Sequence, residues 1–190
     1  MISIVLRTKN EEKYIERCLE SIFNQKIEDK FEVIIVDAGS TDQTLQRAKK
    51  YPISIVNVPP ALFSYGKSLN LGVKNASGQS IVFLSAHALP ASDEWLSNLT
   101  GELKLSDVGA VYGKQEPFPN CNPLETRDLI QDFGDQKMIQ SDCGKFSNAN
   151  SAVKRKLLLE EPFREDIAFA EDKEWAERIT KKYVFSTPAS

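Results

Sequence analysis

A chain of 190 residues with 41% hydrophobic and 27% charged residues is long enough for one globular domain with a sizeable core. Its net charge of −3 provides no broad positive field, so we expect no nucleic-acid partner. No apolar run approaches the roughly 20 residues of a membrane-spanning helix.

The first two thirds of the chain alternate between apolar, β-branched runs and helical patterns. Buried strands are predicted at Ile2–Leu6, Phe31–Val36, Ile53–Val58, Ile81–Leu84 and Val108–Tyr112. Helices are predicted after Asn10 and after Asp42, and over Ser64–Asn75, Trp95–Leu105, Leu124–Phe133, Ser151–Glu160 and Ala170–Lys181. Asn10 is a candidate cap for the first helix, and Ser40 and Gln43 have capping-box spacing for the second.

Strands separated by helices of this length predict an α/β fold with a mainly parallel, doubly wound sheet and helices on both faces. Ligands of such sheets bind beyond the carboxyl ends of the strands. Three predicted strands end there in polar segments, namely Arg7-Thr8-Lys9-Asn10, Asp37–Ser40 and Ser85–His87. We therefore expect the functional site at this rim of the sheet.

The cysteines and the N-terminus predict a cytoplasmic protein. Cys18, Cys121 and Cys143 are odd in number and lack metal-ligand spacing, and Cys18 lies on the apolar face of its predicted helix as a buried thiol. The apolar start of the chain is short and is followed at once by charged residues, unlike a secretory signal. A reducing setting is the simplest interpretation.

Two rim residues have a functional and a structural interpretation. Asp37, between a strand and a helix start, suits hydrogen bonding to a base or ribose, or it ties down its own turn. Lys67 near a helix start can neutralise a diphosphate, or it is a solvated lysine. Ala61 with Gly66-Lys67-Ser68 also fits the loose phosphate-loop pattern of nucleotide hydrolases, but the bulky residues between them would crowd a phosphate cradle.

The remaining candidates are a histidine and an acidic pair. His87 is the only histidine, and its imidazole is either a ligand for a divalent ion or a hydrogen-bonded loop side chain. Glu171 and Asp172 open the last long helix, where acids stabilise the helix dipole but also suit a general base. Trp175, at helical spacing, is expected in the core.

Taken together, six segments resemble the family 2 glycosyltransferases, and within them the rhamnosyltransferase-like branch. They are Ile2–Asn10, Val36–Asp42, Ser64–Gly72, Phe83–Pro90, Phe146–Ala152 and Phe169–Trp175, spread over nearly the whole chain. Val36–Asp42 resembles the Val-Asp-Asp-Gly-Ser-Thr-Asp turn of that family, and Ser85–His87 lies where its Asp-x-Asp metal motif belongs.

The resemblance implies a GT-A fold in one domain over residues 1–190. Residues 1–113 would form the nucleotide-sugar-binding half and residues 114–190 an acceptor and catalytic half, short at its C-terminus because relatives continue with a further strand. It implies inverting transfer of a sugar from a nucleotide donor, with Glu171-Asp172 as the catalytic pair and Asp172 as the base. Arg7, Thr8, Lys9, Asp37 and Lys67 would line the nucleotide, and Mg²⁺ or Mn²⁺ would neutralise the diphosphate.

Two departures from the family pattern modify these expectations. Ala38 replaces an acid that contacts uracil in relatives, which favours a dTDP-linked sugar such as rhamnose over a UDP-sugar. The Asp-x-Asp motif has become Ser85-Ala86-His87, so either His87 and Ser85 hold the metal or metal binding is weak or absent. The alternative to an active enzyme is a catalytically silent domain that binds nucleotide sugars.

The expected acceptor is a saccharide or lipid-linked saccharide in polysaccharide or glycolipid synthesis. A cytoplasmic protein with such an acceptor would work at the inner face of the membrane through peripheral contact.

Overall fold

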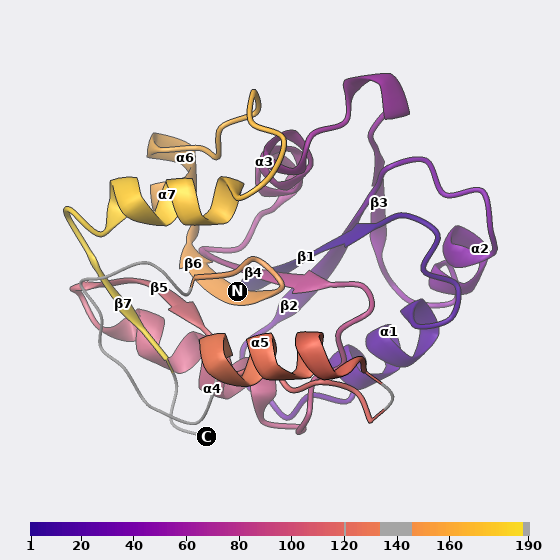
Figure 1. Ribbon diagram of the computed structural model, residues 1–190, viewed down its shortest axis with the longest axis horizontal. Helices are drawn as coiled ribbons and strands as arrows, with labels where there is room; N and C mark the ends of the chain where they lie inside the picture. The colour runs from indigo at the N-terminus through magenta and orange to yellow at the C-terminus, as the bar shows by residue number, and fades with distance from the viewer. Residues whose placement is uncertain (120, 134–145, 188–190) are drawn as a thin grey trace.

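The computed structural model describes residues 1–119, 121–133 and 146–187 of the chain. Within these ranges, seven strands form one sheet in the order β3-β2-β1-β4-β6-β5-β7 (Figure 1). The strands are β1 (Ile2–Thr8), β2 (Phe31–Asp37), β3 (Ser54–Asn57), β4 (Ser80–Ser85), β5 (Val108–Tyr112), β6 (Asn150–Lys154) and β7 (Val184–Ser186). β1 to β4 are mutually parallel, whereas β6 runs antiparallel to its neighbours β4 and β5.

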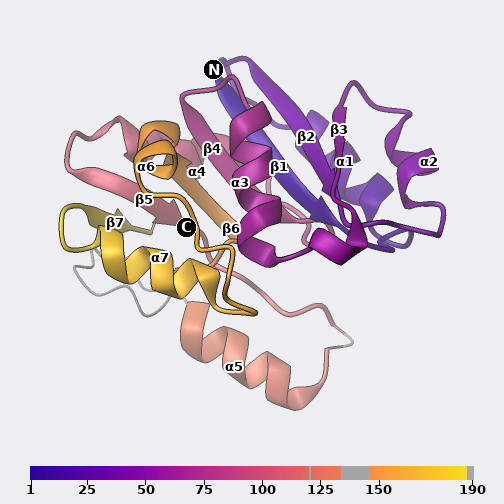
Figure 2. The same ribbon diagram turned by 90° about the horizontal axis from the view of Figure 1, so that it is seen from above.

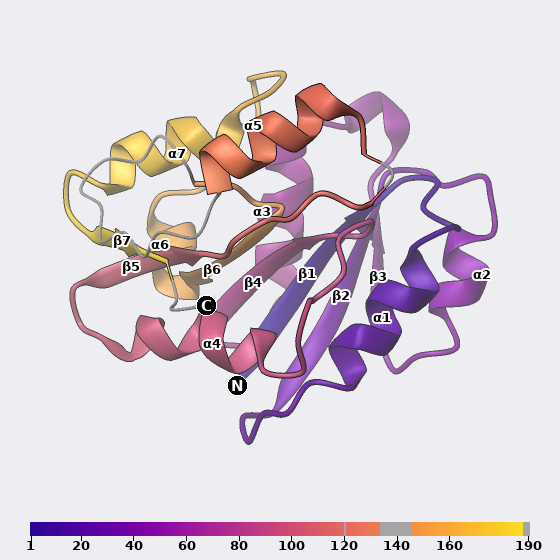
Figure 3. The same cartoon turned by 60° about the horizontal axis from the view of Figure 1, so that its bottom comes forward.

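Helices cover both faces of this sheet (Figures 2 and 3). They are α1 (Ile15–Phe23), α2 (Thr44–Ala48), α3 (Tyr65–Asn75), α4 (Trp95–Gly101), α5 (Pro123–Phe133), α6 (Arg155–Glu160) and α7 (Glu171–Ile179), with 3₁₀ turns η1 (Pro60–Leu62) and η2 (Glu102–Lys104). One apolar core lies under α3, α6 and α7 and a second under α1 and α4, so the α/β class is confirmed. No helix within the described ranges has the length and apolar content needed to cross a bilayer.

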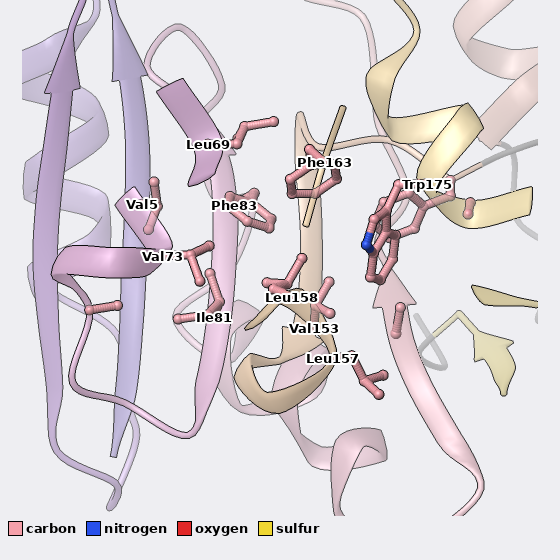
Figure 4. Close-up of a cluster of buried hydrophobic side chains, with 14 of the residues drawn as sticks. Val5, Leu69, Val73, Ile81, Phe83, Val153, Leu157, Leu158, Phe163 and Trp175 are labelled. Atoms are coloured by element: carbon pink, nitrogen blue, oxygen red, sulfur yellow. The ribbon is translucent and has the colours of Figure 1, made fainter. Parts of the chain in front are cut away.

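An aromatic cluster fixes α7 on the sheet. The Trp175 side chain is fully buried, with its ring centroid 5.4 Å from that of Phe163 and 5.5 Å from that of Phe146 (Figure 4 shows Trp175 and Phe163). Its indole Nε1 donates to the Glu161 carbonyl at 2.6 Å, so this buried polar atom is satisfied. Trp175 is thus a core residue, and it sets the position of the acids that open the same helix.

Several local predictions were wrong. The predicted helix over Ser151–Glu160 begins only at Arg155, because residues 150–154 form the buried strand β6 between two sheet neighbours. The predicted helix from Trp95 changes to 3₁₀ geometry after Gly101.

Both predicted caps are also absent. Asn10 adopts a left-handed backbone (φ 57°) and its side chain accepts from the Thr41 N–H at 2.8 Å, while α1 begins five residues later. Ser40 bonds to Asp37 and Asn10 instead of capping α2. The polar side chains therefore join the two loops to each other, where the sequence pattern suggested separate helix starts.

Cys18 is buried, as expected, and burial raises the pKa of its thiol to about 12. Cys143 lies outside the described residues.

Candidate active site

The carboxyl ends of β1, β2 and β4 lie next to one another at one edge of the sheet, as predicted, and strand pairing aligns their polar residues. Thr8 is opposite Asp37 in the β1–β2 register, and Arg7 is opposite Ser85 in the β1–β4 register. Because these strands are parallel, their carboxyl ends open onto the same edge of the sheet. Residues from three loops far apart in sequence therefore share one surface.

Asp37 is buried at this rim, with 2% of its surface exposed. Its Oδ1 accepts from the Thr8 hydroxyl at 3.0 Å and from the Ser40 hydroxyl at 2.5 Å. Its Oδ2 accepts from the backbone N–H groups of Gly39 and Ser40, both at 2.9 Å. Four donors fill the acceptor capacity of one carboxylate, so this arrangement favours the structural interpretation of Asp37, which shapes the turn after β2.

His87 lies on the exposed loop after β4 and faces the loop after β1. Its Nδ1 is 3.1 Å from Oε1 of Glu11, a residue that the sequence analysis did not single out. Ser85 ends β4, where its carbonyl accepts from the Ala88 N–H at 2.8 Å and forms the turn that carries His87. Among the described residues, no three His, Cys, Asp or Glu side chains gather as a complete metal cage.

Arg7 connects the rim to the start of α3 and to the acids that open α7. Its guanidinium lies over the Tyr65 ring, 4.6 Å from the ring centroid, in a cation–π contact from β1 to the start of α3. Burial lowers the pKa of Arg7, and the neighbouring charges of Glu171, Tyr65 and Asp172 oppose that shift. The positive charge of Arg7 therefore interacts with the acidic pair at the start of α7. The sequence analysis predicted Arg7 only as a nucleotide contact.

Glu171 and Asp172 differ in environment. Glu171 is 5% exposed, and burial raises the pKa of its carboxyl group above the ordinary 4.5. Asp172 is only half-buried, and its Oδ2 accepts from the Asn148 N–H at 3.3 Å. Asp172 is the better candidate for contact with an acceptor, because its carboxylate is both held and accessible.

A short chain of contacts connects Asp172 to the rim. The Ala149 carbonyl accepts from the Ser85 N–H at 3.1 Å, and Ala149 directly follows Asn148, whose N–H holds Asp172. The backbone of Asn148 and Ala149 thus contacts both the predicted base and the end of β4, from which the His87 loop leaves. The Nδ2 of Asn148 is buried without a hydrogen-bond partner of good geometry, which marks Asn148 as a further polar residue of this site that sequence reasoning missed.

Lys67 and Lys9 complete the predicted set. Lys67 is in the first turn of α3, where its N–H donates to the Ser64 hydroxyl at 3.1 Å. Gly66 packs so closely on the loop between α6 and α7 that an added Cβ would lie 2.0 Å from the Arg164 carbonyl oxygen. This turn is packed against protein backbone and is not a phosphate cradle, so it does not support the nucleotide-hydrolase alternative. Lys9 is exposed next to Thr8 on the loop after β1.

Known proteins share both the sequence pattern and the fold. The sequence profile described as glycosyl transferase family 2 matches residues 3–161. The O-antigen chain rhamnosyltransferase RfbN of Salmonella typhimurium is 29% identical over 184 residues, which are 90% of this chain and 58% of RfbN. A dolichyl N-acetyl-alpha-D-glucosaminyl phosphate 3-beta-D-2,3-diacetamido-2,3-dideoxy-beta-D-glucuronosyltransferase of Methanococcus voltae is 35% identical over 130 residues, which are 60% of this chain and 39% of that protein.

Among solved structures, the mannosyltransferase PcManGT of Pyrobaculum calidifontis, in complex with GDP-Man and Mn²⁺, is similar with a TM-score of 0.75 and 26% identity. The match covers 100% of this chain and 55% of PcManGT. TarS 1–349 of S. aureus in complex with UDP gives a TM-score of 0.75 at 21% identity, over 100% of this chain and 58% of that chain.

The chain spans less than two thirds of the length of each of these relatives. The profile match nevertheless covers most of the chain, and the mixed sheet with its polar rim agrees with it. This chain belongs to glycosyl transferase family 2 and has the GT-A fold.

Proposed function

We propose that this chain transfers a sugar from a nucleoside-diphosphate donor to an acceptor hydroxyl with inversion at the anomeric carbon. The observation that carries the proposal is the placement of Asp172. Its carboxylate is held by the Asn148 N–H, one residue from the backbone contact between Ala149 and the end of β4. An acid beside the rim where a donor binds is what a single displacement requires.

The donor would lie on residues 1–113, along the carboxyl ends of β1, β2 and β4. Arg7, Thr8 and Lys9 would line it from the loop after β1, while Lys67 adds positive charge at the first turn of α3. Asp37 would act by fixing the Gly39–Ser40 backbone, since its oxygens are already occupied by protein donors.

A divalent ion, Mn²⁺ or Mg²⁺, would act at this rim as a Lewis acid that offsets the charge of the departing diphosphate. His87 offers an exposed imidazole nitrogen and Ser85 a hydroxyl on the same turn, and the diphosphate itself would supply oxygen ligands. The residues present therefore fit a cation that is shared between protein and donor.

In the reaction, the acceptor oxygen attacks the anomeric carbon while Asp172 takes the acceptor proton. The bond from that carbon to the diphosphate oxygen breaks, and the diphosphate leaves with the bonding electron pair. Glu171, which is buried and precedes Asp172 in α7, would place a second acid near the base without exposing it to the acceptor.

The acceptor would be a saccharide or lipid-linked saccharide in polysaccharide or glycolipid synthesis, at the inner face of the membrane. Support comes from the relatives, because one is named for transfer to an O-antigen chain and another for a dolichyl phosphate-linked sugar.

The test compares Asp172→Asn with Glu177→Gln, which removes one exposed charge from the same helix. We expect Asp172→Asn to lower sugar transfer, or slow donor hydrolysis if no acceptor is known, by about 10²–10⁴-fold. Donor binding, measured by thermal shift, should survive because an asparagine oxygen can still accept from the Asn148 N–H. Glu177→Gln should remain active. A wild-type chain that binds nucleotide sugars but neither transfers nor hydrolyses them would instead support the silent binding domain.

A further inference from the structure

Two side chains of types that bind divalent cations meet at the rim. Glu11 comes from the loop after β1 and His87 from the loop after β4, and Oε1 and Nδ1 of the pair are 3.1 Å apart. We propose that Glu11 and His87 together ligate the divalent cation of this enzyme, with Glu11 supplying the carboxylate that the segment Ser85–His87 lacks. The inference rests on the proposed function and adds a specific ligand to it.

The separation of the two atoms matches a shared metal ion. In octahedral Mg²⁺ sites the ligands lie at about 2.1 Å, so adjacent ligands are about 3.0 Å from each other. The same gap suits a hydrogen bond, but a carboxylate oxygen and an imidazole nitrogen lone pair repel unless a proton or a cation lies between them. A metal ion bound to both atoms would lie to one side of the line between them, so it can replace the proton after a rotation of the two side chains and without any large movement of the two loops.

Among the acids of the two loops that follow β1 and β2, Glu11 is the one whose carboxylate contacts His87. Asp37 accepts four hydrogen bonds from its own turn and from Thr8. Asp42 accepts from the N–H groups of Glu12 and Thr44 and from the Thr44 hydroxyl. Glu12 accepts from the Gln43 N–H at 3.0 Å. His87 is the contact that the structure shows for the Glu11 carboxylate, so this group is available to coordinate a metal.

The backbone around Glu11 is fixed before any ligand binds. The Glu11 N–H donates to the Thr44 hydroxyl at 2.7 Å, and its carbonyl accepts from the N–H groups of Tyr14 and Ile15 at 3.0 and 2.9 Å. The preceding residue, Asn10, bonds to the Ser40–Thr41 turn through its backbone and its side chain. Such support is what holds a metal ligand in one orientation.

Two protein ligands are too few for a tight site on their own. Within the described residues no third His, Cys, Asp or Glu completes the set. Mg²⁺-type ions are commonly held by one or two carboxylates together with substrate phosphates. The proposal therefore requires that the cation binds tightly only when a nucleoside diphosphate is present, because its oxygens fill the remaining positions.

The test measures Mn²⁺ binding by the loss of the free-ion electron paramagnetic resonance signal, with and without UDP or dTDP. The variants are Glu11→Gln and His87→Ala, and Glu12→Gln is the matched control because it removes the same charge one residue away. We expect the wild type to bind Mn²⁺ with diphosphate present, Glu11→Gln and His87→Ala to weaken that binding by about 10–100-fold or more, and Glu12→Gln to retain it.

Mn²⁺ binding tests the cation site, and sugar transfer tests the catalytic function, so the two proposals can fail independently. Equal Mn²⁺ binding by Glu11→Gln and the wild type, or no Mn²⁺ binding by the wild type with diphosphate, would overturn the assignment of Glu11 while sugar transfer still supports the enzyme. Selective loss in Glu11→Gln and His87→Ala supports the cation site even if the wild type shows no transfer, which would count only against the catalytic function.

Discussion

Glu171 is a buried acid whose ionisation the fold disfavours. The residue is 5% exposed, and burial raises the pKa of its carboxyl group above the ordinary 4.5. The charge of Asp172 adds to the shift, whereas a hydrogen bond to its own backbone, Arg7 and Asn148 oppose it. A group with a raised native pKa binds its proton more tightly in the folded state, so its contribution to stability is complete below pH 4.5 and is lost as the pH rises through the native pKa.

Replacing this acid by its neutral isostere should therefore stabilise the protein at high pH. We expect Glu171→Gln to raise Tm over the wild type by an amount that is small near pH 4.5 and grows toward pH 8, because glutamine avoids the cost of a buried charge. Differential scanning calorimetry across this range gives the measurement, with exposed Glu177→Gln as the control. A Tm difference that stays constant with pH would show that Glu171 ionises as easily in the native state as in the unfolded chain.

Single residues also show where sequence reasoning ends. The rim positions of Asp37, Ser85 and His87 could be predicted, because a strand end is visible as an apolar run followed by polar residues. Which side chains meet across loops could not. The Glu11–His87 contact joins residues 76 apart, and no local pattern specifies such a pairing.

At the level of elements, the sequence predicted the parallel first half of the sheet better than the second half. β1 to β4 alternate with helices, and β1, β2 and β4 each contain a run of at least three consecutive buried apolar residues. β6 consists of Asn150–Lys154, where Ser151 and Asn150 interrupt the apolar pattern, and it directly precedes α6 without a turn. This segment is a strand because it pairs with β4 and β5. Such long-range pairing leaves no signal in the local pattern of apolar residues, so the sequence did not predict it.

The contact between α3 and the loop before α7 is another element-scale feature, and it can be tested at Gly66. A Cβ there would lie 2.0 Å from the Arg164 carbonyl oxygen, so Gly66→Ala must push the loop away from the helix. We expect a loss of about 1–3 kcal/mol in the free energy of unfolding, measured by urea denaturation, as for other overpacked sites. Transfer should fall as well, because the displaced loop leads into the helix that begins with Glu171 and Asp172.

Gly101 provides the matched control for this substitution. It lies in α4 with helical backbone angles, and an added Cβ meets nothing within 4 Å. Gly101→Ala should leave stability unchanged or raise it by about 0.5–1 kcal/mol, since alanine is the better helix former. Equal stability of the two variants would mean that the loop before α7 is not packed against α3 as the structure shows.

For the whole molecule, donor binding should stabilise the entire sheet. The rim is built from the ends of β1, β2 and β4, which are adjacent central strands, and the two apolar cores lie on either side of them. A ligand that contacts these ends binds the folded chain and not the unfolded one. The stability gained is RT ln(1 + [L]/Kd), which is about 2.7 kcal/mol when the ligand is at 100 times its Kd, or about 5–10 °C in Tm for a chain of this size.

The choice of nucleotide follows from Ala38, which is buried in the turn after β2 beside Asp37. A methyl group at this position cannot accept a hydrogen bond from a base, so a donor that relies on an acid there loses that contact. In a thermal-shift panel with Mn²⁺, we expect dTDP-sugars to raise Tm more than UDP-sugars. The monophosphates dTMP and UMP should raise Tm least, because they offer fewer phosphate oxygens to the cation and to Lys67. A larger shift with UDP-sugars would refute the nucleotide preference. Equal shifts with mono- and diphosphates would place the ligand away from the proposed cation site.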